Sequence, residues 1–484
     1  MRHRILRAAL ALAVLASLSS PHVRLINSSN GNSLYWESPT SIGIVINATG
    51  SDDILDGSHE TTLRVAIDQW NDVNSTSAHL TENTSSVQQA RTDWESSTIH
   101  LIAFDEANTS GFFAPGSGTV AITPVSFYAN GKIADADVLF NGADFAFTTS
   151  ANGGAFDVGA VATHELGHLL GLDHSGWAGA TMYPYVSPTV SAQRSLSLDD
   201  DHGLRQAYSA GTFGAISGTV KRASDDSVVA GAHVTARDAD GRDMGSALAN
   251  ASGVFTIRAL DAGTYTVLAN PLDFPVSENN LTAGHTVDID FAATVGTSIA
   301  VVAGATASYG DLLVDADTSL SLGRGYDDLP LAVTIGDSNV VSLHGSGFAS
   351  TCTLTASDPA LTVTALLGGW TGTSVDFTVD VPSNATPGHC DLEIVDLAGH
   401  RSVLVGALEI VPDEPQVNSV TPDFGSIDGG TALSIDGSHF RAGARVVLGA
   451  QIYEDGAPGG CTVVDDSTIT LTTAKGKRCF SSRC

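Results

Sequence analysis

The chain has 484 residues, which predicts three or four domains at about 100–200 residues each. Its composition, with 43% hydrophobic and 15% charged residues, excludes a disordered chain. Its net charge of −31 argues against nucleic acid as a partner, because so acidic a chain repels polyphosphate.

The first 20 residues have the pattern of a secretory signal peptide. Three arginines within the first seven residues precede the apolar run Ala8–Leu18, and two serines follow it. A run this short favours a cleaved signal over the alternative, an N-terminal membrane anchor. No later stretch is long and apolar enough to span a bilayer. We therefore expect a secreted, extracellular and soluble protein that has no transmembrane segment once the signal is removed.

The region that follows mixes helical and strand patterns, which predicts an α+β domain. Apolar residues in the range 63–73 recur at three- and four-residue steps, as on an amphipathic helix. Asp157 is a suitable N-cap for a helix that runs to Leu170, and Ser197 opens a capping box for a last helix through Tyr208. Strands are expected at 41–46, 98–104, 121–123 and 136–140.

After Gly211 the helical periodicity disappears, and short alternating runs separated by Gly, Asp and Asn predict all-β sandwich modules. The acidic stretch Pro412–Pro415 predicts a stiff linker. The run Leu343–Phe348 resembles Ile435–Phe440, which lies one Ig-sized module further along. The expected organisation is multidomain: a signal peptide (1–20), an α+β domain (21–211) and three β-modules (212–292, 293–412 and 413–484).

All five cysteines lie in the last third of the chain. In an oxidising compartment Cys352 could pair with Cys390 and Cys461 with Cys479, which would leave Cys484 without a disulfide partner. The sequence alone does not fix this pairing. Four basic residues crowd into the last ten positions of an otherwise acidic chain, which favours a truncated or frameshifted terminus over a basic binding tail.

One stretch carries metal chemistry, the run HELGHLLGLDH that begins at His164. His164 and His168 are four residues apart, so on a helix both imidazoles face one ion. Glu165 lies beside the first ligand, where it can reach a metal-bound water. Gly171 permits a left-handed turn that brings His174 back as a third ligand. Three nitrogen ligands leave the fourth zinc position open, as a catalytic site requires and a structural site does not.

With this motif the sequence resembles the metzincin metallopeptidases, and within them the matrixin branch. Ala180–Pro184 looks like the family's Met-turn, with Met182 under the metal, and Leu198–Tyr208 is similar to its closing helix. Gly131–Asn141 looks like the strand before the active-site helix in bacterial members. The resemblance implies a zinc endopeptidase with one catalytic zinc, often with structural calcium, and places the wall of the S1′ pocket in Tyr183–Ser197.

The sequence departs from the animal matrixins in two respects. The first 351 residues hold no cysteine, which excludes a cysteine switch, and residues 101–163 hold no histidine, so the second, structural zinc site is absent as usually built. Asp135 and Asp137 could bind calcium, or could equally cap a β-turn. His100 and His202 are isolated, and we expect them to be packed or surface histidines rather than ligands.

The leading hypothesis is a secreted, monomeric zinc endopeptidase that acts on a protein or peptide substrate. It would hydrolyse peptide bonds with a zinc-activated water and with Glu165 as the general base. The alternative is an adhesive or matrix-binding protein whose peptidase domain is secondary or inactive. The intact motif favours activity, because a decayed enzyme would be expected to lose Glu165 first.

The β-modules carry resemblances of their own. Residues 215–292 resemble a carboxypeptidase regulatory-like sandwich, residues 415–484 an IPT/TIG Ig-like module, and residues 293–411 a degenerate relative of the latter. Because these folds serve many roles, spacer and stability modules are favoured over substrate adhesion. A chain cut near residue 212 is expected to keep the proposed zinc ligands and the proposed pocket wall, and to cleave small peptides at close to the full-length rate, because few contacts should cross that boundary.

Overall fold

The computed structural model describes residues 23–475, apart from short gaps. The gaps are residues 97–98, 151–153, 189–190, 274–275, 283–285, 289, 316–318, 324–328, 412–414, 442 and 449–450. The predicted signal peptide, Cys479, Cys484, most of the basic terminus and the centre of the predicted linker lie outside the described residues. The chain divides into two compact units, residues 1–410 and 411–484. In the part that the structure describes, no helix is long and apolar enough to cross a membrane.

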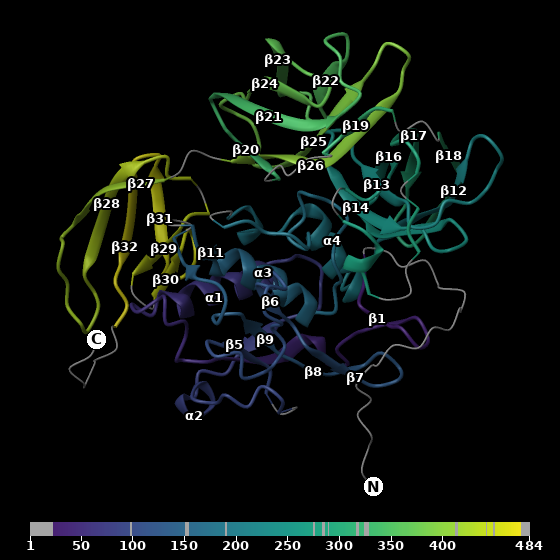
Figure 1. Cartoon of the computed structure of the whole chain (residues 1–484). Coiled ribbons are helices and arrows are strands. Elements are labelled where there is room, and N and C mark those ends of the chain that lie inside the picture. Colours follow the sequence, from purple (N-terminus) through teal and green to yellow (C-terminus); the bar gives the residue numbers. More distant parts are fainter. Residues whose placement is uncertain are drawn as a thin grey trace. The chain divides into compact units, whose positions relative to one another are not determined.

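The first module combines a five-stranded sheet with helices, which confirms the predicted α+β class (Figure 1). In sheet order the strands are β4 (Leu80–Glu82), β3 (Ile42–Ile46), β5 (Leu101–Phe104), β9 (Val138–Phe140) and β6 (Ala121–Ile122). The edge strand β6 runs antiparallel to β9, whereas the other pairs are parallel. The helices are α1 (Ser58–Asn71), α2 (Ser86–Gln89), α3 (Val158–Leu169) and α4 (Leu198–Ala207). The remaining strand pairs are β1 (Ile26–Asn27) with β2 (Asn32–Ser33), β7 (Val125–Phe127) with β8 (Ile133–Ala136), and β10 (Phe147–Thr148) with β11 (Phe156–Asp157).

Helices α1 and α3 pack on one apolar core, which explains the amphipathic pattern of α1. Trp70 of α1 is 1% exposed, and its Nε1 donates a hydrogen bond to the Thr163 carbonyl of α3 at 2.9 Å. A buried indole N–H without a partner would cost about 1–3 kcal/mol, so this bond favours one fixed contact between the two helices. The helix begins at Ser58, earlier than predicted, directly after the left-handed Gly57.

The second module is a seven-stranded sandwich. Its strands are β12 (Gly214–Arg222), β13 (His233–Arg237), β14 (Asp243–Leu248), β15 (Val254–Leu260), β16 (Gly263–Asn270), β17 (Thr294–Val301) and β18 (Thr306–Val314). The sheet orders are β15-β12-β18 and β14-β13-β16-β17. The predicted boundary after residue 292 is too early, because β17 pairs with β16 and β18 pairs in parallel with β12. The module therefore extends to Val314.

The third module is a sandwich of two four-stranded sheets. One sheet contains β19 (Ser321–Leu322), β21 (Ser338–Ser346), β24 (Ser374–Asp380) and β23 (Thr362–Trp370). The other contains β20 (Leu331–Thr334), β26 (Arg401–Val411), β25 (Gly388–Val395) and β22 (Thr353–Ala356). Cys352 and Cys390 are separate free thiols, so the disulfide considered between them is not formed. Burial raises the pKa of the Cys390 thiol to about 12, which makes its thiolate scarce.

The fourth module lies in the second compact unit. Its main sheet contains β27 (Gln416–Thr421), β28 (Ala432–Ser438), β32 (Thr468–Thr472) and β31 (Cys461–Asp465), and β29 (Arg445–Leu448) pairs with β30 (Gln451–Glu454). Its own apolar core includes Ile435, Tyr453 and Ile469. Cys461 is a buried free thiol, whereas Cys479, considered as its partner, lies outside the described residues.

The second and third modules cover a loop of the first, residues 174–182. Ala178 lies in a buried cluster with Leu272 of the second module, and Trp177 lies in another with Val405 of the third. At Gly179 the backbones meet so closely that a Cβ there would lie 2.3 Å from the Gly406 carbonyl oxygen. The modules are therefore packed against this loop, and are not simply connected in series.

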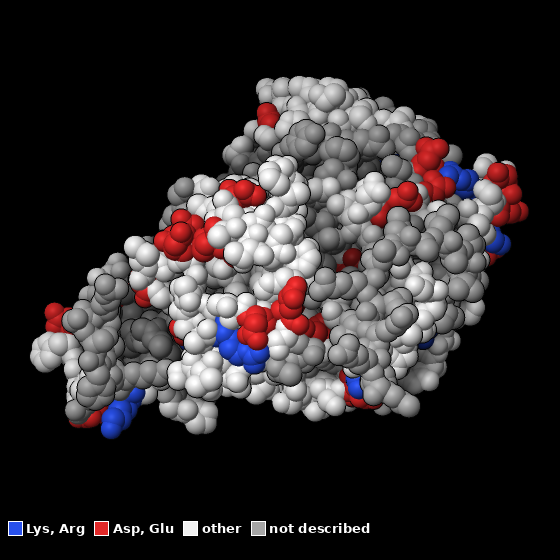
Figure 2. Space-filling view, turned by 60° about the horizontal axis from the view of Figure 1, so that its bottom comes forward, with Lys and Arg blue, Asp and Glu red and all other residues white. Residues whose placement is uncertain are grey.

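The surface reflects the acidic composition. Figure 2 shows several groups of Asp and Glu side chains and fewer Lys and Arg on the face in view. This distribution agrees with the net charge of −31, which disfavours association with polyanions.

Candidate active site

Helix α3 carries the metal motif and has defined ends. Asp157 caps it by accepting a hydrogen bond from Ala160 N at 2.9 Å, as the sequence predicts, and Arg194 pairs with the same carboxylate. Beyond the last turn, Gly171 has a φ of 90°, the predicted left-handed conformation. A Cβ there would lie 2.9 Å from the Leu34 carbonyl oxygen, so glycine is needed for both the turn and the close contact.

The three motif histidines each direct Nδ1 toward a backbone carbonyl. The pairs are His164 with Thr181 at 2.8 Å, His168 with Leu172 at 2.9 Å, and His174 with Asn280 in a short contact. Because a carbonyl oxygen only accepts, each Nδ1 carries the proton and donates it. Each Nε2 therefore keeps its lone pair for another partner.

The geometry of these histidines fits a zinc ion. One ligand atom from each histidine lies within 4.8 Å of the others, and His168 Nε2 is 3.3 Å from His174 Nε2. Two nitrogens bound tetrahedrally at about 2.0–2.1 Å from zinc would lie about 3.3–3.4 Å apart. Burial lowers the pKa of His164 to about 3 and also that of His168, so both rings are neutral at pH 7. Converging lone pairs repel one another unless a cation lies between them.

Glu165 is a buried carboxylate next to this cluster. It is 6% exposed, and burial raises its pKa to about 7. The Thr123 hydroxyl donates to Glu165 Oε2 at 2.6 Å. Thr123 was not among the predicted site residues. It lies directly after β6, at the end of the strand predicted at 121–123.

Met182 lies under helix α3. A Cβ on Gly167 of that helix would be 2.2 Å from Met182 Sδ, so glycine makes room for the methionine. Asp200, the third residue of α4 and the partner of Ser197 in its capping box, accepts hydrogen bonds from Met182 N at 3.1 Å and Thr181 N at 2.8 Å. The cap of α4 thus also holds the turn that supports the histidines.

A cavity of about 470 Å³ opens beside the histidines. The residues that line it are Leu25, Ile26, Leu34, Thr119, Ala121, Ile122, Thr123, Val125, Phe127, Glu165, His168, Asp173, His174, Asn280, Leu281 and Thr282. No described residue of the predicted S1′ wall, Tyr183–Ser197, is among them, and residues 189–190 of that wall lie outside the described part. The S1′ assignment therefore stays a prediction.

Three lining residues come from beyond the first module. Asn280, Leu281 and Thr282 lie between β16 and β17 of the second module, yet they line the cavity with Glu165. The expectation that few contacts cross the boundary near residue 212 is therefore wrong. Residue identity carries no sign of these contacts, because a backbone carbonyl such as that of Asn280 exists at every residue.

The other predicted site residues lie apart from the zinc motif. Asp135 Oδ1 is 2.9 Å from His100 Nδ1, and Asp137 accepts a hydrogen bond from Leu101 N at 2.7 Å. Burial raises the pKa of Asp137 to about 8. In the described residues, the histidine triad is the one cluster of three or more metal-ligating side chains, so calcium at this pair stays a prediction. His202 is buried and contacts the Arg258 carbonyl, which agrees with a packed histidine.

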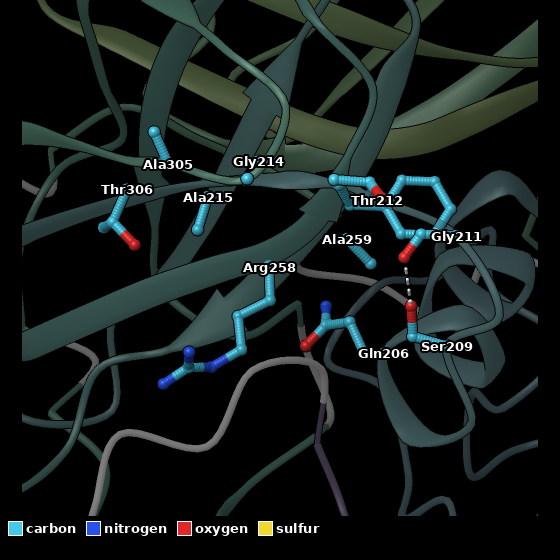
Figure 3. A pocket seen from close by; sticks show the side chains of 12 residues that line it. Gln206, Ser209, Gly211, Thr212, Gly214, Ala215, Arg258, Ala259, Ala305 and Thr306 are labelled. Carbon is cyan, nitrogen blue, oxygen red and sulfur yellow. Dashed lines mark hydrogen bonds between the residues drawn. The ribbon is translucent and has the colours of Figure 1, made fainter.

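A second cavity, of about 390 Å³, lies where the chain leaves α4 for β12 (Figure 3). The Ser209 hydroxyl donates a hydrogen bond to the Gly211 carbonyl at 3.3 Å. Figure 3 shows Arg258 on the opposite side of the cavity. Arg258 is the one charged residue among those that line it, and no acid, histidine or cysteine accompanies it. This cavity lies at the junction of the first and second modules.

Comparison with known families agrees with this geometry. Residues 36–209 match the matrixin family, residues 215–294 the carboxypeptidase regulatory-like domain, and residues 415–482 the IPT/TIG domain. The chain therefore contains a region that matches the matrixin family, followed by all-β modules.

Individual relatives match over part of their length. The chain is 32% identical to karilysin of Tannerella forsythia over 166 residues, which is 30% of this chain and 32% of karilysin. It is 41% identical to stromelysin-1 of Mus musculus over 101 residues, 20% of each chain, and 48% identical to metalloendoproteinase 1 of Glycine max over 54 residues, 11% of this chain and 17% of that protein. The chain thus spans 32% or less of the length of these relatives.

Solved structures add little. The major pilin subunit BcpA of Bacillus cereus aligns at 9% identity with a TM-score of 0.16, over 54% of this chain and 85% of that chain.

Proposed function

We propose that this chain is an exported zinc-dependent endopeptidase that cleaves peptide bonds within a protein substrate. The observation that carries the proposal is the convergence of three histidine ligand atoms beside buried Glu165, at the wall of an open cavity. The basic and apolar pattern of the first 20 residues supports export. Zinc held by His164, His168 and His174 would supply a Lewis acid that polarises the scissile carbonyl and the attacking water.

Glu165 moves the proton in this scheme. Its carboxylate accepts a proton from the attacking water and passes it to the nitrogen of the leaving amine. Since the Thr123 hydroxyl donates to Oε2, the proton exchange is assigned to the other carboxylate oxygen, Oε1.

Strand β6 offers a place for the substrate backbone. It is the edge strand of the five-stranded sheet, and Ala121, Ile122 and Thr123 line the cavity next to Glu165. An extended peptide can add to such an edge through main-chain hydrogen bonds, with alternate side chains entering pockets. Eight of the 16 lining residues are apolar, and three of them, Ala121, Ile122 and Val125, lie on or next to β6. We therefore expect a substrate with an apolar side chain on this side of the cleaved bond.

The direct test is cleavage of casein by the purified chain, with and without a zinc chelator. We expect hydrolysis that the chelator abolishes and that added zinc restores. The matched control is Glu165→Gln, which should bind zinc but cleave at a rate lower by about 10²–10⁴-fold. A wild-type chain that binds zinc and cleaves nothing would favour the adhesive alternative instead.

A further inference from the structure

The segment Val276–Thr282 connects two strands of the second module by way of the active site. It contains the short 3₁₀ turn Glu278–Asn280, which opens with a capping box at Ser277. Residues so far from the zinc motif in sequence would ordinarily belong to the sandwich alone. Here they lie against the third histidine of the triad and line the same cavity.

Two neighbouring residues of the first module are held by this segment. The Asn280 carbonyl oxygen accepts a hydrogen bond from His174 Nδ1. Asp173 Oδ2 accepts from Thr282 N at 2.7 Å and from the Thr282 hydroxyl, and Asp173 Oδ1 accepts from His174 N at 2.9 Å. The ring and the backbone of His174 are thus both oriented by bonds that lead to the segment.

Apolar and polar contacts anchor the segment to the first module. Leu281 is 6% exposed and belongs to a buried cluster with Ala178 and Tyr183. Upstream, Asp273 Oδ2 accepts from Ala178 N at 3.0 Å, and Asp273 N donates to Gly176 O at 3.1 Å. These bonds fix the segment and the loop after His174 as one packed structure.

We propose that Asn280, Leu281 and Thr282 are positioning and specificity residues of the peptidase site, supplied by the second module. Asn280 and Thr282 hold the third zinc ligand in its tautomer and orientation. Leu281 and Thr282 form a wall of the cavity that receives an apolar substrate side chain. The specificity part rests on the proposed function, whereas the positioning of His174 does not.

The test compares two buried leucines of the second module in the full chain. Leu281→Ala loosens the segment, whereas Leu312→Ala removes the same atoms from the sandwich core, where Leu312 is 3% exposed. Zinc affinity is measured by competition with a chromogenic chelator, and thermal unfolding is recorded for both. Loss of an outer partner of a ligating histidine typically costs about 10–100-fold in metal affinity. We expect at least about a 10-fold loss for Leu281→Ala and none for Leu312→Ala at a similar loss of stability.

A second variant and a second measurement distinguish the positioning role from the specificity role. Thr282→Val removes the hydroxyl that donates to Asp173 and keeps the size of the side chain, so it should weaken zinc binding less than Leu281→Ala does. On a peptide library varied at one position, both variants should alter the ratio of kcat/KM between large and small apolar side chains.

Each outcome bears on one proposal. Unchanged zinc affinity in Leu281→Ala, or an equal loss in Leu312→Ala, would overturn the positioning role. Unchanged selectivity in an active enzyme would overturn the role as a cavity wall. A wild-type chain without chelator-sensitive turnover, in which Leu281→Ala still weakens zinc, would remove the proposed function and leave the positioning role intact.

Discussion

The two sides of the zinc site are held in different ways. His164 and His168 lie on helix α3, and their Nδ1 atoms donate to Thr181 and Leu172 of the same module. His174 lies beyond the helix, and its Nδ1 meets a carbonyl that is 106 residues further along the chain. The helical side can therefore form within one module, whereas the third ligand depends on a module that follows.

The largest effects should come from the helical side. His168→Ala should abolish zinc binding, because the two remaining histidine ligands hold zinc too weakly. Turnover should then fall below detection. Zinc stoichiometry by atomic absorption, together with peptide turnover, measures both effects. The comparison is Glu165→Gln, which should keep one zinc and lose only turnover. Equal zinc loss in both variants would contradict this division of roles.

A chain that ends at residue 212 tests the dependent side as a whole. It keeps His164, His168 and His174 but loses Asn280 and the surfaces that cover Trp177 and Ala178. We expect zinc affinity to fall by about 10–100-fold, and self-association through the uncovered apolar loop. Chelator competition and size-exclusion chromatography measure these effects. A monomeric short chain with full zinc affinity and full kcat/KM on small peptides would show that the first module is independent after all.

Gly179→Ala addresses the contact with the third module. The added Cβ would lie 2.3 Å from the Gly406 carbonyl oxygen, so one backbone must move. We expect a loss of about 1–3 kcal/mol in the free energy of unfolding, measured by denaturant titration. Gly43→Ala is the control, because a Cβ there meets nothing within 4 Å. Equal stability of the two variants would mean that the third module is not docked at this glycine.

The last prediction concerns the pH dependence of stability. Burial raises the pKa of Asp273 to about 8, far above the value of about 3.9 for an unfolded chain. The folded state therefore keeps a proton that the unfolded state loses, so its contribution to stability is present at acid pH and is lost as pH rises through 8. Asp273→Asn cannot lose a proton, so its melting temperature should exceed that of wild type by more at pH 8.5 than at pH 5, at about 2–4 °C per kcal/mol.

The control for this pH effect is Asp225→Asn. Asp225 is an exposed carboxylate of the same module, and hydrogen bonds from Ser227 lower its pKa. Its replacement should bring no gain in stability at alkaline pH. If Asp273→Asn were equally neutral from pH 5 to 8.5, the buried carboxyl would not carry the proton argued here.

The sequence predicted the parts of the site that depend on local chemistry. The spacing of His164 and His168, the cap at Asp157 and the left-handed Gly171 each follow from rules that act within a few residues, and the structure shows the cap and the turn as predicted. The α+β class and the later β-modules also follow from local periodicity. The roles of the ligands themselves stay predictions until the metal is measured.

The missed features are those that pair distant parts of the chain. Strands β17 and β18 complete the second sandwich from beyond the predicted boundary, because sheet pairing is not visible in local patterns. The partner of His174 is a main-chain oxygen, which leaves no mark on residue identity at position 280. Thr123 belongs to the same class, because its contact with Glu165 joins residues 42 positions apart that only the fold brings together.

The contact between His174 and Asn280 also sets an order in time. A ribosome adds about 5–20 residues per second, so roughly 5–20 s separate the synthesis of these two residues. During that interval the helix with its two histidines can already exist, while the third ligand has no partner to orient it. The site is thus completed only after much of the second module has been made, and a nascent chain passes through a stage in which the motif is present and the finished site is not.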